Sequence, residues 1–169
     1  YHPWTDVPAG LLAGNLVQYH WRTRADFSPE KWDLNFGVWR DGELLGTQGV
    51  ATEHFLVTRT GETGSWLGLE HQGQGIGTAM RQAMCAFLFD HVGFEEITSG
   101  AFSDNPASLG VSRKVGYRAN GVRRLKRREG ELATNLGLVL SPGDLVRGEH
   151  PLEVEGVAPF RRSIGLDPG

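Results

Sequence analysis

Alternating apolar and polar positions predict a β-hairpin near the start of the chain. Leu34, Phe36 and Val38 occupy every second position of one run, which is the pattern of a half-buried strand. Asp41-Gly42 follows as a two-residue turn of the I′ type, and a second apolar run covers residues 44–51. We therefore expect two antiparallel strands that begin a sheet.

Apolar residues at three- and four-residue spacing predict a long helix from position 76 to about Phe89. We expect Arg81 and Gln82 on its opposite, polar side, and its end near Gly93. The predicted core face consists of Ile76, Met80, Ala83, Met84, Phe87 and Leu88.

The second predicted helix has clear end signals. Asn105 is a suitable N-cap, Pro106 suits the first helical position, and Gly116 suits a left-handed C-terminal residue. Leu109, Val111 and Val115 can pack inward.

Other segments complete a mixed α/β order of strands and helices, with helices on the faces of one sheet. We expect a short helix around residues 11–21 and a turn-like segment over 58–64. Prolines and glycines from Ser141 onward predict an irregular, extended tail. Further strands are expected over residues 64–70, 96–102, 117–126 and 131–140.

Composition favours one globular domain. The chain has 169 residues, 39% hydrophobic and 22% charged, and a net charge of −3, which gives no case for a nucleic-acid surface. Cys85 is the single cysteine, so an internal disulfide and a cysteine-rich metal site are excluded, and we expect a small core residue there. No apolar run approaches the roughly 20 residues of a membrane span. We expect a cytoplasmic protein, with residues missing before Tyr1.

A glycine-dense segment, Gln72-Gly73-Gln74-Gly75-Ile76-Gly77-Thr78, joins a predicted strand to the long helix. Backbone N–H groups and the helix dipole at such a junction favour an anion, most often a phosphate. The simpler alternative is a tight strand-to-helix turn. A dinucleotide fingerprint would need glycine at position 78, and a nucleotide triphosphate loop would need a lysine, so neither motif fits.

Two motifs together resemble the GCN5-related N-acetyltransferase (GNAT) family. The first is Gln72-x-x-Gly75-x-Gly77, which resembles the family's pyrophosphate loop. The second is Asn105-Pro106-Ala107-Ser108, followed in the same predicted helix by Gly116-Tyr117, and this motif lies one strand after the loop. The resemblance covers residues 33–140. The detailed pattern is most similar to ribosomal-protein N-terminal acetyltransferases and to an actinobacterial subgroup described as succinyl-CoA or acetyl-CoA transferases.

The resemblance implies the GNAT fold, a twisted, mixed, mostly antiparallel sheet of about six to seven strands with helices on both faces. It implies an acyltransferase domain over residues 1–147 and a first strand upstream of Tyr1. The prolines and glycines of residues 148–169 predict that this remainder is the extended tail.

The implied activity is transfer of an acetyl or succinyl group from acyl-CoA to a primary amine, without a metal. The amine would belong to a protein N-terminus, a lysine or a small molecule, with no nucleic-acid or membrane partner. The implied donor-binding residues are Leu67, Gly68, Leu69, Gln72, Gly73, Gln74, Gly75, Ile76, Gly77, Thr78, Asn105 and Ser108.

Several residues are candidates for the catalytic roles. Glu70, at the end of the predicted strand, is the first candidate for the general base, and its alternative role is to stabilise the helix dipole. Glu53 and a chain of water are further candidates. Many family members carry tyrosine where this chain has Ser112, so Ser112 and Ser108 are both candidates for the acid. His71 is interpreted as a solvated residue, and Tyr117 as a packing residue.

Two questions about function stay open at the level of sequence. A succinyl carboxylate would need a nearby cation, for which Arg22, Arg24 and Arg59 are available without known geometry. The arginine-rich segment 123–128 is interpreted as a solvated face. The alternative to an enzyme is a non-catalytic acyl-CoA-binding regulatory module, and the long tail makes a homo-oligomer plausible.

Overall fold

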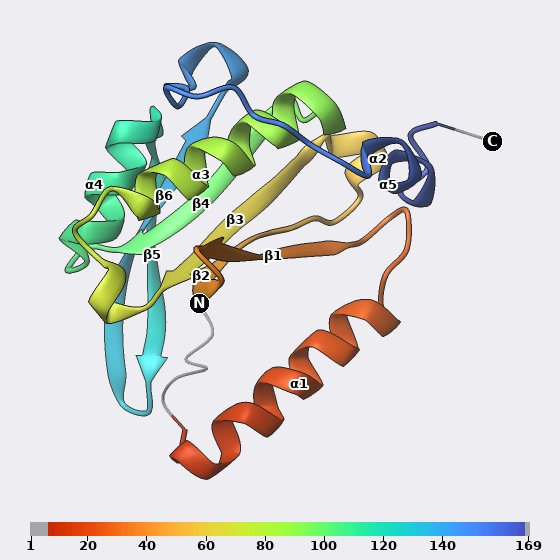
Figure 1. Ribbon diagram of the computed structural model, residues 1–169. Helices are drawn as coiled ribbons and strands as arrows, with labels where there is room; N and C mark the ends of the chain where they lie inside the picture. Colours follow the sequence, from red (N-terminus) through yellow and green to blue (C-terminus); the bar gives the residue numbers. More distant parts are fainter. Residues whose placement is uncertain (1–6, 168–169) are drawn as a thin grey trace.

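The computed structural model describes residues 7–167 and has six strands in one open sheet within that range (Figure 1). The strands are ordered β1-β2-β3-β4-β6-β5, and every neighbouring pair is antiparallel except β3 and β4. This confirms the predicted mixed, mostly antiparallel α/β sheet. The elements are α1 (Ala9–Ala25), β1 (Asp33–Arg40), β2 (Glu43–Ala51), α2 (Phe55–Thr58), β3 (Thr60–Leu67), η1 (Leu69–His71), α3 (Ile76–Phe87), η2 (Leu88–Val92), β4 (Glu96–Phe102), α4 (Pro106–Val115), β5 (Arg118–Arg128), β6 (Glu131–Leu140), η3 (Pro142–Asp144) and α5 (Val157–Ser163).

Hairpins form both outer pairs of the sheet. Between β1 and β2, Asp41 and Gly42 have φ angles of 52° and 82°. Two consecutive positive φ values are those of a type I′ turn, so the predicted turn is confirmed. Glu129 and Gly130 join β5 to β6.

The centre of the sheet opens between β3 and β4. These strands pair in parallel only from Thr60↔Glu96 to Thr63↔Ser99. Beyond this register β3 continues to Leu67 and β4 to Phe102, with no pairing between them among the described residues. The two strands therefore leave an opening, which we call the β3–β4 gap, toward the start of α3.

Helices α3 and α4 lie over one face of the sheet (Figure 1). They pack against each other and enclose the main core, in which Val115 of α4, Cys85 of α3 and Ile97 of β4 are fully buried. A cluster of aromatic rings extends this core, where Trp32 makes edge-to-face contacts with Phe55 and other rings.

Strand β3 differs from the predicted segment. It begins at Thr60, so the prediction of a turn over 58–64 is wrong. Gly61 lies inside the sheet, where an added Cβ would come within 2.8 Å of the Ala51 carbonyl oxygen, so this glycine permits a close backbone approach. The predicted strand end is also wrong, because β3 stops at Leu67 and residues 69–71 form a single 3₁₀ turn.

The chain after position 141 is not extended throughout. A 3₁₀ turn occupies Pro142–Asp144, and α5 covers Val157–Ser163, which corrects the predicted extended tail over 148–169. Val157, Phe160 and Ile164 recur at helical spacing and pack into the core, where Ile164 is fully buried. Burial of this apolar stripe is the physical reason for the helix. No helix in residues 7–167 combines the length and apolar character that crossing a membrane requires.

Candidate functional site

The glycine-dense segment forms a loop that leads from the 3₁₀ turn η1 into α3. Gly73 and Gly75 have φ angles of 74° and 82°, a region that side chains with a Cβ rarely adopt. Gly75 is the N-cap of α3. A Cβ at Gly77 would lie 3.5 Å from Val111 of α4, an ordinary van der Waals contact, so the loop and α4 are close neighbours here.

Two glutamine side chains hold this loop in place. Gln72 Nε2 donates to the Leu67 carbonyl oxygen at 3.1 Å, and Gln74 Nε2 donates to the Glu70 carbonyl oxygen at 3.0 Å. The Thr78 N–H donates to the Gly75 carbonyl oxygen at 3.0 Å, so this predicted pyrophosphate donor already has a partner. The N–H groups before Thr78 are the ones at the positive end of the helix dipole.

One hydrogen bond shows which backbone groups of β3 face the β3–β4 gap. The Gly68 N–H donates to the Leu45 carbonyl oxygen of β2 at 2.8 Å. Backbone groups of successive strand residues alternate in direction, so those of Ser65 and Leu67 are directed toward the gap. Of the predicted donor-binding stretch Leu67–Leu69, Leu67 thus lies on this edge, whereas Gly68 is bonded to β2.

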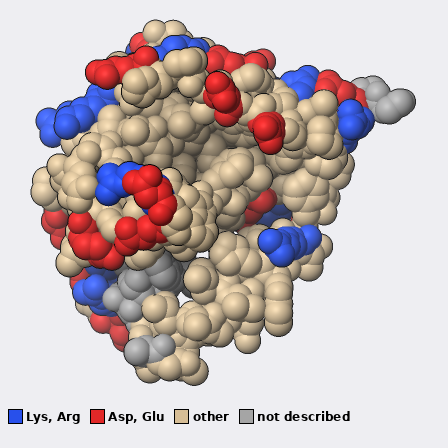
Figure 2. Space-filling model, in the orientation of Figure 1, with Lys and Arg blue, Asp and Glu red and all other residues tan. Residues whose placement is uncertain are grey.

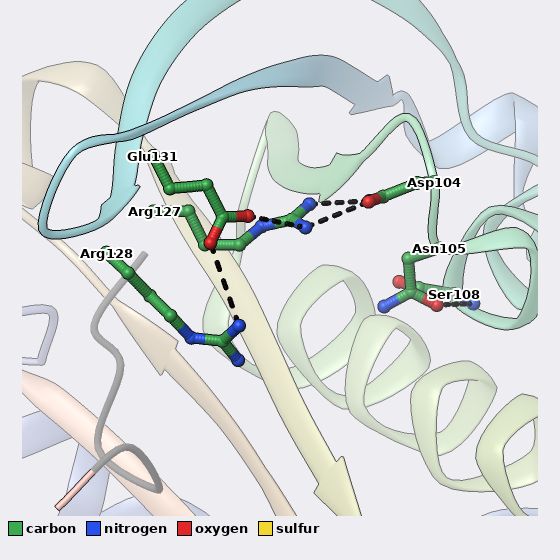
Figure 3. A network of polar contacts seen from close by, with 6 residues as sticks. All are labelled: Asp104, Asn105, Ser108, Arg127, Arg128 and Glu131. Carbon is green, nitrogen blue, oxygen red and sulfur yellow. Dashed lines mark hydrogen bonds and ion pairs between the residues drawn. The ribbon is translucent and has the colours of Figure 1, made fainter.

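Helix α4 begins as predicted. Asn105 Oδ1 accepts a hydrogen bond from the Ser108 N–H at 3.0 Å (Figure 3). Pro106 is the first helical residue, and Gly116 ends the helix with φ 108°. The predicted cap, first turn and C-terminal glycine are therefore confirmed. The same bond occupies Asn105 Oδ1, which leaves its amide group as the part of the side chain able to donate.

A cluster of charged residues ties the start of α4 to the β5–β6 hairpin (Figure 3). The Arg127 guanidinium donates to both carboxylate oxygens of Asp104 and contacts Glu131 at 3.3 Å. It also lies 4.1 Å from the centre of the Phe102 ring. The hydrogen bonds from Arg127 lower the pKa of Asp104. The interpretation of segment 123–128 as a solvated face is therefore wrong at Arg127.

Arg81 of α3 is buried, which corrects its prediction as a polar-face residue. It is 5% exposed. Its Nη1 donates to Ser112 Oγ of α4 at 2.9 Å, and its Nη2 donates to Ser65 Oγ of β3 at 2.6 Å. Position 81 precedes Cys85 by one helical turn and therefore shares the buried face. The two serine hydroxyls make this burial possible for an arginine.

Ser112, one of the two predicted acids, is buried and fully engaged. Its hydroxyl donates to the Ser108 carbonyl oxygen at 3.0 Å and accepts from Arg81. Ser112 is 1% exposed, whereas Ser108 is partly exposed near the start of α4. The structure thus links the two predicted serines through one backbone oxygen.

A second buried polar group lies beneath this cluster. The Tyr117 hydroxyl is 2.8 Å from Thr63 Oγ1 and 3.4 Å from Cys85 Sγ. Burial raises the pKa of the Cys85 thiol from 9.0 to about 11, and burial also raises the pKa of Tyr117. The predictions of a core cysteine and a packing tyrosine are confirmed.

The predicted base, Glu70, and its neighbour His71 lie in the η1 turn, immediately before the glycine-dense loop. The Glu70 carboxylate is 72% exposed, and its Oε1 is 3.7 Å from His71 Nε2. The same His71 nitrogen is 3.6 Å from Glu43 Oε1. His71 is buried, so its interpretation as a solvated residue is wrong, because the η1 turn directs the ring inward beneath Gly68.

Two other carboxylates change the list of candidate bases. Glu53 is not on a strand but in the bend after β2, at the end of the sheet far from the loop, which corrects its predicted place. Glu62, which sequence reasoning missed, is exposed on β3 next to Thr63, where β3 and β4 stop pairing. Its side chain alternates with that of Thr63 and so lies on the face opposite Arg81.

In the view of Figure 2, the hollow near the middle of the molecular face is formed by uncharged residues, and charged side chains lie around it. Among residues 7–167, no group of three or more His, Cys, Asp or Glu side chains is placed to hold a metal ion.

Comparison with known proteins gives a consistent pattern. The family model described as "Acetyltransferase (GNAT) domain" matches residues 13–118, which is more than half of the chain. A crystal structure described as "Probable acetyltransferase" is 22% identical, with a TM-score of 0.67 over 83% of this chain and 78% of that one.

Two other solved structures share the fold. Mycobacterium smegmatis RimJ in complex with CoA-disulfide is 23% identical, with a TM-score of 0.68 over 80% of this chain and 65% of that one. A spermidine N-acetyltransferase SpeG chimera from Vibrio cholerae and hSSAT is 16% identical, with a TM-score of 0.66 over 77% and 78%. At these identities the likeness is one of fold.

Proposed function

The chain belongs to the acetyltransferase (GNAT) domain family, and on this premise we propose that it transfers an acyl group from acyl-CoA to a primary amine. The amine nitrogen attacks the thioester carbonyl carbon directly, so no acyl-enzyme is formed. The donor is acetyl-CoA or a related acyl-CoA such as succinyl-CoA.

The observation that carries the proposal is the β3–β4 gap beside the glycine loop. Pairing stops at Thr63↔Ser99, and the backbone groups of Ser65 and Leu67 are directed into the opening. An extended amide-containing chain could add to this edge as a further strand. The pantetheine arm has amide groups of this kind.

The pyrophosphate of the donor would bind at the start of α3. The loop has two glycines at positive φ, and N–H groups up to Gly77 precede the first bonded N–H of the helix at Thr78. An anion there is favoured by these donors and by the helix dipole. Gln72 and Gln74 would act indirectly, because their side chains fix the loop.

The start of α4 would bind the other side of the pantetheine. Asn105 and Ser108 are adjacent on the first turn, and the Asp104–Arg127 pair holds this turn against the hairpin. The Asn105 amide and the Ser108 hydroxyl are available as hydrogen-bonding groups for the donor.

We assign the role of general base to Glu70 and a hydrogen-bonding role toward the leaving group to Ser108, because the Ser112 hydroxyl already donates to the Ser108 carbonyl oxygen and accepts from Arg81. Glu70 is exposed at the mouth of the loop, and a carboxylate can take the ammonium proton directly or through water. A backbone N–H on the free edge of β3 would polarise the thioester carbonyl.

The proposed acceptor is a primary amine, and an assay with a panel of amines identifies its class. Structural neighbours include a spermidine N-acetyltransferase, so a polyamine belongs in the acceptor panel beside peptide N-termini and lysine. The test is to incubate the protein with acetyl-CoA or succinyl-CoA and each amine, and to measure the release of free thiol. We expect amine-dependent release with at least one donor and acceptor pair.

The second candidate is a regulatory module that binds acyl-CoA without catalysis. It is favoured by the engagement of the Ser112 hydroxyl in two hydrogen bonds and by the exposure of Glu70. Tight CoA binding without thiol release from any pair in the panel would establish this candidate and contradict the enzyme.

A further inference from the structure

Arg81 carries a buried positive charge that no carboxylate in residues 7–167 neutralises. Its two hydrogen bonds go to the neutral hydroxyls of Ser65 and Ser112, and its Nε is buried with no partner among the described residues. A guanidinium stays protonated in proteins, and burying an unpaired charge is costly. Such a cation in a folded protein is expected to meet an anion that is not part of the chain.

The Arg81 guanidinium lies beside the part of the β3–β4 gap where we expect the thioester end of the bound acyl-CoA. Ser65 is two residues beyond Thr63, where pairing of β3 with β4 stops, and Ser112 lies on α4. Arg81 therefore connects β3 to α4 beside the β3–β4 gap. It is six residues along α3 from Gly75, about 9 Å of helix. The pyrophosphate would occupy the loop, so the reacting end of the donor is the part nearest to Arg81.

On the basis of the proposed function, we propose that the Arg81 guanidinium contacts the sulfur of the acyl-CoA thioester and stabilises the thiolate that leaves. Ser65 and Ser112 are positioning residues that hold the guanidinium. A preorganised cation in a site that excludes water is an effective way to stabilise a charge that develops during the reaction.

The reaction step is balanced as follows. The amine lone pair forms a C–N bond to the carbonyl carbon, and the carbonyl electrons move to oxygen. When the tetrahedral intermediate collapses, the C–S bond breaks and its electron pair stays on sulfur as thiolate. The ammonium proton passes to the base, and Arg81 donates hydrogen bonds to sulfur without giving up a proton.

In this assignment Ser112 positions Arg81, whereas the tyrosine found at this position in many relatives is the candidate acid for the leaving thiolate. The Ser112 hydroxyl donates its own hydrogen to the Ser108 carbonyl oxygen, so it has no second hydrogen to give to sulfur. Its remaining interaction is to accept from Arg81. The charge of Arg81 then replaces a proton donor at this place in the fold.

The direct test is the pKa of the CoA thiol bound to the protein, read from the ultraviolet absorbance of the thiolate as the pH is raised. The spectrum of the CoA-free protein is subtracted at each pH to remove Cys85 and the tyrosines. In the wild-type complex we expect a pKa at least one unit below that of a free thiol, which is about 8.5. In Arg81→Met the decrease should vanish, and in Arg81→Lys part of it should remain.

Arg113→Met is the matched control, because Arg113 is an exposed arginine on α4. It should leave the thiol pKa of the complex unchanged. An equal pKa in the wild type and in Arg81→Met would overturn the assignment. The absence of any CoA binding to the wild type would instead contradict the proposed function itself, so the two failures are distinct.

Kinetics supply the second test. We expect Arg81→Met to lower kcat by about 100-fold with little change in KM, which is the order of loss for one group that stabilises developing charge. If Arg81→Met loses only the use of succinyl-CoA and keeps that of acetyl-CoA, the cation serves an acyl carboxylate and the thiolate assignment is wrong. If Arg81→Met does not fold by circular dichroism, Ser65→Ala and Ser112→Ala test the same point. Each should raise the bound thiol pKa, and no rise in either would overturn the proposal.

Discussion

The carboxylates of Glu70 and Glu62 differ in their position relative to the β3–β4 gap. Glu70 is exposed at the loop, whereas Glu62 lies where the strands stop pairing, on the sheet face opposite Arg81. We expect Glu70→Gln to lower kcat by about 100-fold or more, because a general base contributes on that order. The measurement is kcat at saturating donor as a function of pH.

Glu62→Gln is the matched control for this prediction, since it removes the same charge from β3, the strand that precedes the turn with Glu70. It should keep kcat within a few-fold of the wild type. If the large loss follows Glu62→Gln and not Glu70→Gln, the base has been assigned to the wrong carboxylate, and the amine then approaches from the face opposite α3.

Cys85 makes stability depend on pH in the alkaline range. Its pKa is 9.0 ordinarily and about 11 in the fold, where burial disfavours the thiolate. The folded state therefore holds the proton more tightly than the unfolded state. Stability from this source is fully present below pH 9 and is lost as the pH rises through about 11.

Urea unfolding at pH 8 and pH 10 measures this loss. One pKa unit corresponds to about 1.4 kcal/mol, so we expect a decrease of about 1 kcal/mol in the free energy of unfolding. Tyr117 adds a decrease of the same sign, since its pKa is also raised. The decrease should become smaller in Cys85→Ala, and an equal decrease in that variant would contradict the role of the thiol.

Single residues show where sequence reasoning reached its limit. Cys85 and Tyr117 are buried as expected, because small or aromatic side chains in apolar segments usually join the core. Arg81 and His71 are buried against expectation. Their burial depends on Ser65, Ser112 and Glu43, which are distant in sequence, so no local pattern contains the signal.

At the scale of elements, the loop before α3 depends on the conformation of its glycines. Gly75 has φ 82°, so Gly75→Ala should lower the free energy of unfolding by about 1 kcal/mol and weaken CoA binding. Gly14 offers the matched control within α1, because nothing lies within 4 Å of an added Cβ. Gly14→Ala should raise stability by up to about 1 kcal/mol.

Thermal unfolding and calorimetric titration with CoA measure both effects. The same glycine-to-alanine change should then give opposite signs of stability change, and only the loop variant should lose affinity. Unchanged CoA affinity in Gly75→Ala would contradict the proposed place of the pyrophosphate.

Elements with local signals were predicted well, and those with only long-range determinants were not. The strand over 96–102 and the ends of α4 match the structure, because apolar alternation and capping residues lie within the segments themselves. The start of β3 was missed, because Gly61 looks like a turn residue in sequence. Its true role is to fit against the Ala51 carbonyl of the neighbouring strand.

At the scale of the whole molecule, the β3–β4 gap is the feature that no local pattern predicts. It arises because β3 and β4 pair over four registers while each strand is longer. Order and register of strands depend on pairing between distant segments. The resemblance to a known family implied the whole fold, whereas the residues alone predicted individual strands and helices and an anion-binding loop.

The contacts of the segment after residue 147 show whether this segment belongs to the core of the domain or is a separate tail. Ile164 is fully buried, and Phe160 lies 5.3 Å from Trp32 in an edge-to-face contact between ring centres. Arg161 also donates to the His91 carbonyl oxygen at 2.8 Å. These contacts come from residues beyond 147, so the core of the domain includes α5 and Ile164.

We therefore expect Ile164→Ala to lower the free energy of unfolding by about 3 kcal/mol, the usual cost of removing a large side chain from a filled core. Ser163→Ala is the matched control, because Ser163 is exposed on the same helix and should change stability by about 0.5 kcal/mol or less. A chain that ends at residue 147 should lose cooperative unfolding in urea, since Trp32 and its aromatic neighbours would be exposed. Cooperative unfolding of that shortened chain at the same urea concentration would show that the segment is a separate appendage.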